Sequence, residues 1–160
     1  MFANVKENFL ICQMNRIVFF LVILVLFSCT SNRKKLDLKI NRFDQALFLI
    51  NEENIEDVSV ELQANFGTFN EVFSSQIMQK GNLTNEQYLQ EILHFTHHKD
   101  MREAYDSVAI LFTDFTDFEK ELEFAFWQFS DYFPSYPIPE ITTFFGGFNY
   151  GVVTYDDNIA

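Results

Sequence analysis

The chain has 160 residues, a formal net charge of −12 at pH 7 and 21 phenylalanines. This acidic balance argues against a role in binding nucleic acid, because phosphate contacts depend on Lys and Arg side chains. The part that follows the first thirty-five residues is long enough for one domain with its own core. We therefore expect a single folded domain over 36–160, with most phenylalanines inside it.

The first 28 residues predict an export signal. An unbroken apolar run over 17–27 follows Arg16. A membrane-spanning helix needs about 20 apolar residues, so this shorter run has the length typical of the apolar region of a signal peptide. Met14 offers an alternative translation start, because Met14-Asn15-Arg16 is a more ordinary short basic beginning than residues 1–13.

Cys29 is the predicted site of lipid attachment. Leu26, Phe27, Ser28 and Cys29 have the form of a lipobox, with a branched apolar residue three places before the cysteine and a small residue directly before it. We expect cleavage before Cys29, which then carries diacylglycerol and an N-acyl chain such as palmitate. The alternative is a short membrane helix that ends in a cysteine. Residues 29–35 are then a polar, lipidated tether, and no thiol is left for a disulfide.

Most of the following sequence has helical spacing of apolar residues. A capping-box pattern at Thr84 and Gln87, and another at Thr116 and Glu119, predict two helix starts, and Pro134 predicts the end of the last helix. The expected helical segments cover 44–51, 55–65, 66–73, 84–95, 99–111 and 116–133.

The last predicted helix carries a stripe of apolar residues that we expect to face the core. The stripe consists of Phe118, Leu122, Ala125, Phe126, Phe129 and Phe133. Its carboxylates lack the spacing of a calcium loop, so we interpret them as a solvated face with capping residues. We interpret Tyr132 to Pro137 as a rigid linker whose aromatic side chains cover the core, in preference to a docking surface for another protein.

Three segments have the composition of strands. Residues 36–43 alternate apolar and polar residues, and 141–145 and 148–155 are rich in β-branched and aromatic residues. Gly146-Gly147 between the last two predicts a β-hairpin. The expected fold class is α+β and mostly α-helical, with a helical layer followed by a hairpin that looks like the start of an incomplete sheet.

His94, His97 and His98 are the only candidate metal ligands that we single out. They lie close together, but the glutamate of a His-Glu-x-x-His site is absent. We favour a partly exposed helix end with histidines near its negative pole, and we expect no metal and no cofactor other than the lipid on Cys29. The chain has no nucleophile elbow, phosphate-binding loop or dinucleotide fingerprint, so we expect no enzymatic activity.

The order of several segments resembles the gliding-motility lipoprotein GldB family. The segments are the lipobox, 37–44 (DLKINRFD), 125–134 (AFWQFSDYFP), 138–144 (IPEITTF) and 147–151 (GFNYG), and the resemblance extends from Cys29 to Ala160. It implies a periplasm-facing lipoprotein associated with the gliding and type IX secretion machinery, without an established enzymatic role. It also implies that the domain is the N-terminal part of a larger one, truncated here.

The resulting hypothesis is a lipid-anchored, non-enzymatic envelope lipoprotein with envelope proteins as partners and the membrane as its support. Thr30-Ser31 lacks an acidic retention residue. By a rule that is carried over from similar lipoproteins, this absence slightly favours the outer membrane over the inner one. Two alternatives stay open. In the first alternative, the chain is the N-terminal fragment of a zincin-like metallopeptidase-related domain. In the second, it is a non-functional truncated fragment.

Overall fold

The fold is described from a computed structural model, which covers residues 36–80 and 85–160. The predicted signal peptide, the lipobox residues Leu26, Phe27 and Ser28, the lipidation site Cys29 and the tether lie outside the described residues. The capping residue Thr84 lies outside them as well.

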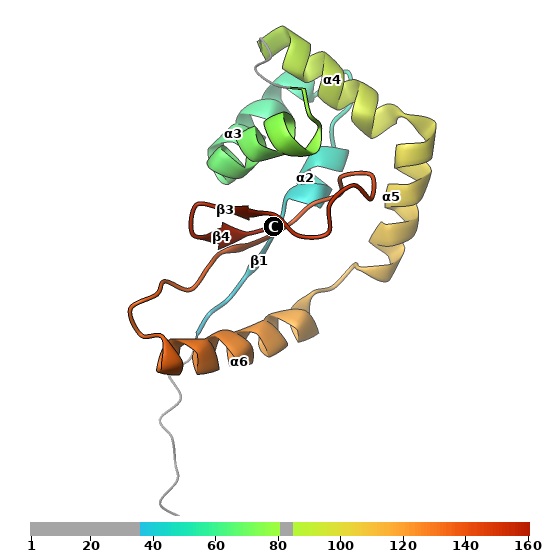
Figure 1. The fold of residues 1–160 in the computed structure, drawn as a ribbon. Helices are drawn as coiled ribbons and strands as arrows, with labels where there is room; N and C mark the ends of the chain where they lie inside the picture. The colour runs from blue at the N-terminus through green and yellow to red at the C-terminus, as the bar shows by residue number, and fades with distance from the viewer. Residues whose placement is uncertain (1–35, 81–84) are drawn as a thin grey trace, which may run out of the picture. The chain divides into compact units, whose positions relative to one another are not determined.

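A small mixed sheet brings distant parts of the chain together (Figure 1). Its order is β1 (Ile40–Arg42), β2 (Ile141–Thr143), β4 (Asn158–Ile159) and β3 (Thr154–Tyr155). β1 runs parallel to β2, β2 runs parallel to β4, and β3 is antiparallel to β4. The expected mostly helical α+β class is confirmed.

The helices occupy most of the chain between β1 and β2. They are α2 (Phe43–Phe48), α3 (Ile55–Val72), the π-helix η1 (Phe73–Ile77), α4 (Asn85–His97), α5 (Lys99–Leu111) and α6 (Thr116–Tyr132). α5 has the predicted bounds. The two helical segments expected over 55–65 and 66–73 meet at a kink inside α3. The kink lies at Gly67, whose φ of +31° is a conformation that glycine adopts without a Cβ clash.

The position of the predicted hairpin is wrong. β2 pairs with β1 and β4 and makes no ladder with β3, so the segment around Gly146-Gly147 is a loop that leads away from the sheet. The hairpin joins β3 to β4 instead, and turns at Asp156, which has a φ of +47° that aspartate tolerates better than most residues. The strand β1 pairs in parallel with the edge of β2 that the predicted hairpin would have needed for its second strand.

Aromatic rings form much of the core. Phe43 packs edge-on against Phe69 at 5.0 Å and tilted against Phe73 at 4.9 Å between ring centroids. Phe48 stacks on Tyr105 at 3.8 Å. Such ring pairs add to the free energy that burial of their large apolar surface provides. The aliphatic members of this cluster are Leu47, Ile50, Leu62, Ile77 and Ile92.

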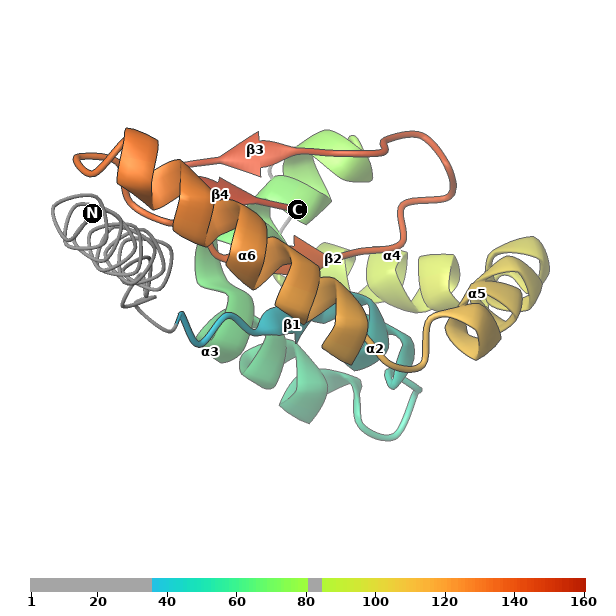
Figure 2. The same cartoon turned by 90° about the horizontal axis from the view of Figure 1, so that it is seen from below.

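The predicted burial of the aromatic stripe of α6 is wrong, because none of the residues of α6 is buried. Phe118 is 48 % exposed, Phe133 is 49 % exposed and Tyr132 is 79 % exposed. The predicted linker aromatics do not cover the core either, since Tyr136 is also exposed. Figure 2 shows α6 in front of the sheet when the molecule is viewed from below.

Two carboxylates explain this placement of α6. The backbone N–H of Ile40 donates to Glu119 Oε1 at 3.0 Å, and that of Leu38 donates to Glu123 Oε1 at 3.2 Å. β1 is an edge strand, and its outward N–H groups need acceptors. The expected solvated role is therefore wrong for these two glutamates. The predicted Thr116–Glu119 capping box is wrong too, because Asp114 Oδ1 accepts from the Thr116 N–H at 2.9 Å.

Candidate functional site

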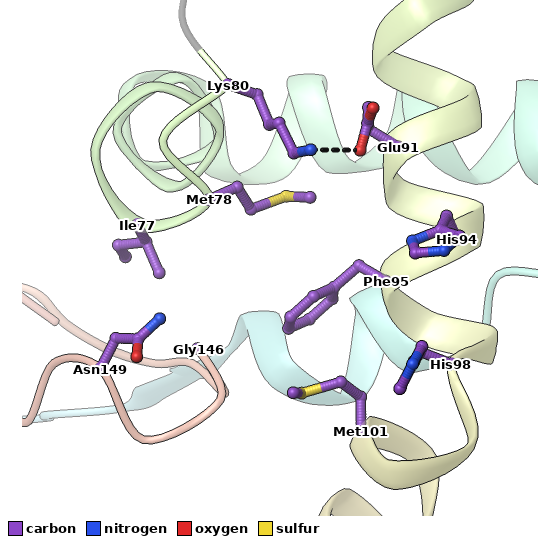
Figure 3. Close-up of a pocket in the computed structure, with 10 residues that line it drawn as sticks. All are labelled: Ile77, Met78, Lys80, Glu91, His94, Phe95, His98, Met101, Gly146 and Asn149. Atoms are coloured by element: carbon purple, nitrogen blue, oxygen red, sulfur yellow. Dashed lines mark ion pairs between the residues drawn. The ribbon is translucent and has the colours of Figure 1, made fainter.

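A cleft with a volume of about 270 Å³ lies between η1, α4, the start of α5 and the loop after β2 (Figure 3). It collects side chains from segments that are far apart in the sequence. The lining residues are Ile77, Met78, Lys80, Glu91, His94, Phe95, His98, Met101, Gly146 and Asn149. This combination of apolar side chains, imidazoles and an ion pair makes the cleft the candidate site.

Two of the three predicted histidines share the cleft. His94 and His98 lie one helical turn apart, with 5.9 Å between their ring centroids. His97 does not line the cleft: its Nδ1 lies 3.2 Å from the carbonyl oxygen of Leu93 and 3.1 Å from Thr96 Oγ1. Within 36–80 and 85–160, no group of three His, Cys, Asp or Glu side chains is placed to hold a metal ion.

The apolar part of the cleft comes from Met78, Phe95 and Met101, together with Ile77 (Figure 3). A Cβ at Gly146 would lie 2.8 Å from Ile77 Cγ2 and therefore could not be accommodated without movement. Sequence reasoning assigned this glycine to a hairpin turn. Gly146 is needed because Ile77 of η1 lies so close to it. These two residues are far apart in the sequence, so the residues around the glycine pair do not indicate their contact.

An ion pair borders the cleft. Lys80 Nζ lies 2.8 Å from Glu91 Oε2, and both side chains are partly exposed (Figure 3). A pair in contact with water contributes at most about 1 kcal/mol to stability. Its clearer effect is that the carboxylate of Glu91 balances the charge of Lys80 at the border of the cleft.

A second polar group lies at the carboxyl ends of β1 and β2. Arg42 donates from Nε and Nη2 to the two oxygens of Asp44, at 2.9 and 2.7 Å, and Thr143 Oγ1 donates to Asp44 Oδ1 at 2.6 Å. The hydrogen bond to Asp44 raises the pKa of Arg42. The guanidinium also lies 4.5 Å from the ring centre of Phe115. Each of these groups has a partner within the cluster, so we interpret the cluster as a structural link between α2, the sheet and the segment before α6.

Comparison with known proteins identifies the family. The family described as gliding motility protein GldB matches residues 29–160. The chain belongs to the GldB family. The match confirms the resemblance drawn from the sequence and associates the chain with gliding motility. The 37–44 segment quoted for that resemblance includes β1, Arg42 and Asp44.

No curated protein and no solved structure matches this GldB-family chain significantly. Among the helices of the described residues, none is both long and apolar enough to cross a bilayer.

Proposed function

We propose that this GldB-family chain is a lipid-anchored, non-enzymatic cell-envelope lipoprotein of the gliding-motility and type IX secretion machinery. The observation that carries the proposal is the family match, which begins at Cys29. This is the residue that the lipobox predicts as the first of the mature protein and as the acceptor of lipid. Lipid on Cys29 supplies the location, and the folded domain supplies the contact with envelope partners.

The surface that supports partner binding surrounds α6. Phe112, Phe115 and Phe118 contact one another at its beginning. Phe129, Phe133 and Tyr136 form a second group at its end. We call these six residues the aromatic surface. Phe115 and Phe129 are half-buried and the other four are exposed. Exposed apolar side chains that gather in this way are typical of sites that bind other proteins.

The charge next to the aromatic surface favours one kind of partner. α6 carries a single cation, Lys120, among the carboxylates Asp117, Glu119, Glu121, Glu123 and Asp131. We therefore propose an envelope protein that presents apolar side chains flanked by Lys or Arg. Complementary charge accelerates association and disfavours other partners.

The distance from the anchor favours a partner at the membrane. Leu36, the first described residue, follows Cys29 by seven residues. Seven residues span at most about 25 Å. The Leu38 N–H contacts Glu123 of α6, so lipid on Cys29 keeps the aromatic surface within a few nanometres of a bilayer. The missing acidic retention residue at Thr30-Ser31 leads us to propose the outer membrane.

Substitution of Cys29 tests the anchor. We expect the wild-type chain, expressed in a gliding bacterium, to incorporate an alkyne-tagged fatty acid and to appear in the membrane fraction. Cys29→Ala should abolish labelling and reduce colony spreading, whereas Cys12→Ala, which alters the other cysteine, should change neither. Unchanged labelling in Cys29→Ala would refute the anchor. Normal spreading and secretion in a strain without the gene would refute the role in motility.

A further inference from the structure

We propose that the outer edge of β1 is a docking site for an extended, acidic segment of another protein, and that α6 covers this edge in the folded chain. β1 lies at one end of the four-stranded sheet. The backbone N–H groups of Leu38, just before β1, and of Ile40 donate to carboxylates of α6 and not to a neighbouring strand. This site differs from the aromatic surface and does not depend on the function proposed above.

The two glutamates of α6 match the donor spacing of a strand. Along a strand, N–H groups on the same side recur every second residue, about 6.6 Å apart. Along a helix, residues four apart are separated by about 6 Å. Glu119 and Glu123 are four apart in the chain, and their donors Ile40 and Leu38 are two apart. The helix therefore places its carboxylates where a neighbouring strand would place its carbonyl groups.

A paired strand would serve this edge more fully than α6 does. An ionised carboxylate accepts hydrogen bonds but has no proton to donate. Glu119 and Glu123 therefore cannot pair with the outward carbonyl groups of the same strand, whereas a neighbouring strand offers both N–H and C=O groups. None of the residues of α6 is buried, so its apolar contacts with the rest of the domain are incomplete. An extended peptide that takes the place of α6 thus forms additional backbone hydrogen bonds.

Lys39 determines the charge of the partner. Its Nζ lies 3.7 Å from Glu119 Oε2, and its side chain is 72 % exposed. A partner with Asp or Glu opposite Lys39 replaces this ion pair when α6 leaves the edge. A second copy of the chain fits less well. An antiparallel pair of β1 edges centred on residue 39 would place two Lys39 side chains opposite each other, and like charges in that position destabilise a sheet.

Peptide binding to the full chain in mild detergent tests the docking site. The probe is a fluorescein-labelled peptide of alternating Thr and Val with one central Glu, and fluorescence anisotropy measures its affinity. Glu119→Ala/Glu123→Ala frees the edge and should bind the probe at least tenfold more tightly than the wild type. Glu121→Ala/Asp131→Ala is the matched control, because it removes the same charge from exposed positions of α6. Its affinity should change less than twofold.

Ile40→Pro in the freed variant tests whether the edge itself binds the probe. Proline removes the N–H that the peptide needs and is tolerated on the outer side of an edge strand, so the gain in affinity should disappear. Amide hydrogen exchange at Leu38 and Ile40 in the freed variant should slow when the probe binds. Glu119→Ala alone should show a smaller gain, which provides a second measurement if the double variant does not fold. Near-UV circular dichroism checks the folding of each variant.

Several outcomes would overturn the proposal. They are the absence of probe binding to a folded freed variant, an equal gain of affinity in Glu121→Ala/Asp131→Ala, and a gain that persists in Ile40→Pro. Tighter binding of a probe with Lys in place of its Glu would contradict an acidic partner. Dimerisation of the freed variant without probe, measured by analytical ultracentrifugation, would identify a second copy as the occupant instead.

Discussion

Glu119 of α6 accepts a hydrogen bond from the backbone N–H of Ile40 in β1, 79 residues earlier in the chain, at 3.0 Å. The same carboxylate lies 3.7 Å from Lys39 Nζ. An edge strand that exposes a row of N–H groups can pair with another chain. Glu119 and Glu123 occupy these donors, so they attach α6 to the sheet by its polar side and leave its aromatic residues outside the core.

Substitution of Glu119 should therefore loosen α6. We expect Glu119→Ala to lower the free energy of unfolding by about 1–2 kcal/mol, because the Ile40 N–H loses its acceptor. Glu119→Gln keeps an acceptor oxygen and should lose less. Glu121→Ala is the control, since Glu121 is exposed and has no such role. Chemical denaturation measures the three values. Equal losses in Glu119→Ala and Glu121→Ala would contradict this explanation.

The contrast between core and surface phenylalanines gives a second prediction. Phe43 is fully buried and contacts the rings of Phe66, Phe69 and Phe73. Phe43→Ala should lower the free energy of unfolding by about 3–5 kcal/mol. Phe118→Ala should lower it by less than about 1 kcal/mol, because Phe118 lies outside the core. A larger loss for Phe118→Ala in urea denaturation would show that the aromatic surface stabilises the fold.

The aromatic surface should matter for function more than for stability. We expect the double variant Phe118→Ser/Phe133→Ser to remain folded and membrane-bound but to reduce colony spreading, because it removes apolar contacts from a partner. Leu49→Ser/Val60→Ser is a matched control, since both residues are exposed apolar side chains that belong neither to α6 nor to the aromatic surface. Comparable spreading by the two variants, at equal protein levels, would argue against the aromatic surface as the docking site.

Tyr88 should make stability depend on alkaline pH. Burial raises its pKa to about 12 from an ordinary value of 10.0. Its hydroxyl donates to Asn70 Oδ1 in the folded state. Between pH 10 and 12 the unfolded chain loses this proton while the folded chain keeps it, so stability is intact below pH 10 and falls towards pH 12, by about 2 kcal/mol.

Tyr88→Phe isolates this effect from the titration of other groups. The difference in free energy of unfolding between wild type and Tyr88→Phe should be constant from pH 7 to 9 and should shift in favour of the variant above pH 10. Denaturation series at pH 8, 10 and 11 measure it. A difference that stays constant through pH 11 would show that Tyr88 ionises normally in the folded protein.

Gly146 should tolerate substitution poorly because of space. A Cβ there would lie 2.8 Å from Ile77 Cγ2, so Gly146→Ala must displace η1 or the loop and should cost about 1–3 kcal/mol. Gly151→Ala is the control, because a Cβ at that position meets no atom within 4 Å. Thermal unfolding compares the two variants. An unchanged midpoint in Gly146→Ala would mean that η1 or the loop moves to accept the added Cβ without a loss of stability.

The sequence alone determined the elements that depend on local patterns. Helical spacing predicted α5 with its bounds, and Pro134 marked the end of α6. The order of segments from Cys29 onward indicated the GldB family, which the family match confirmed. Periodicity of this kind reflects backbone geometry and the need of each element to bury one side, so it can be recognised without a partner.

Which surfaces meet depends on contacts between distant parts of the chain. The strand at Ile141–Thr143 pairs with Ile40–Arg42 at the other end of the domain. Of the two loop glycines that predicted a hairpin, Gly146 lies beside Ile77 of η1 and Gly147 beside Met101 of α5. The carboxylates of α6 face an edge strand, and two of three neighbouring histidines share a cleft with distant methionines. Strand pairing and packing join residues that are far apart in the chain, and the backbone N–H groups of Leu38 and Ile40 meet the carboxylates of α6 only in the folded protein.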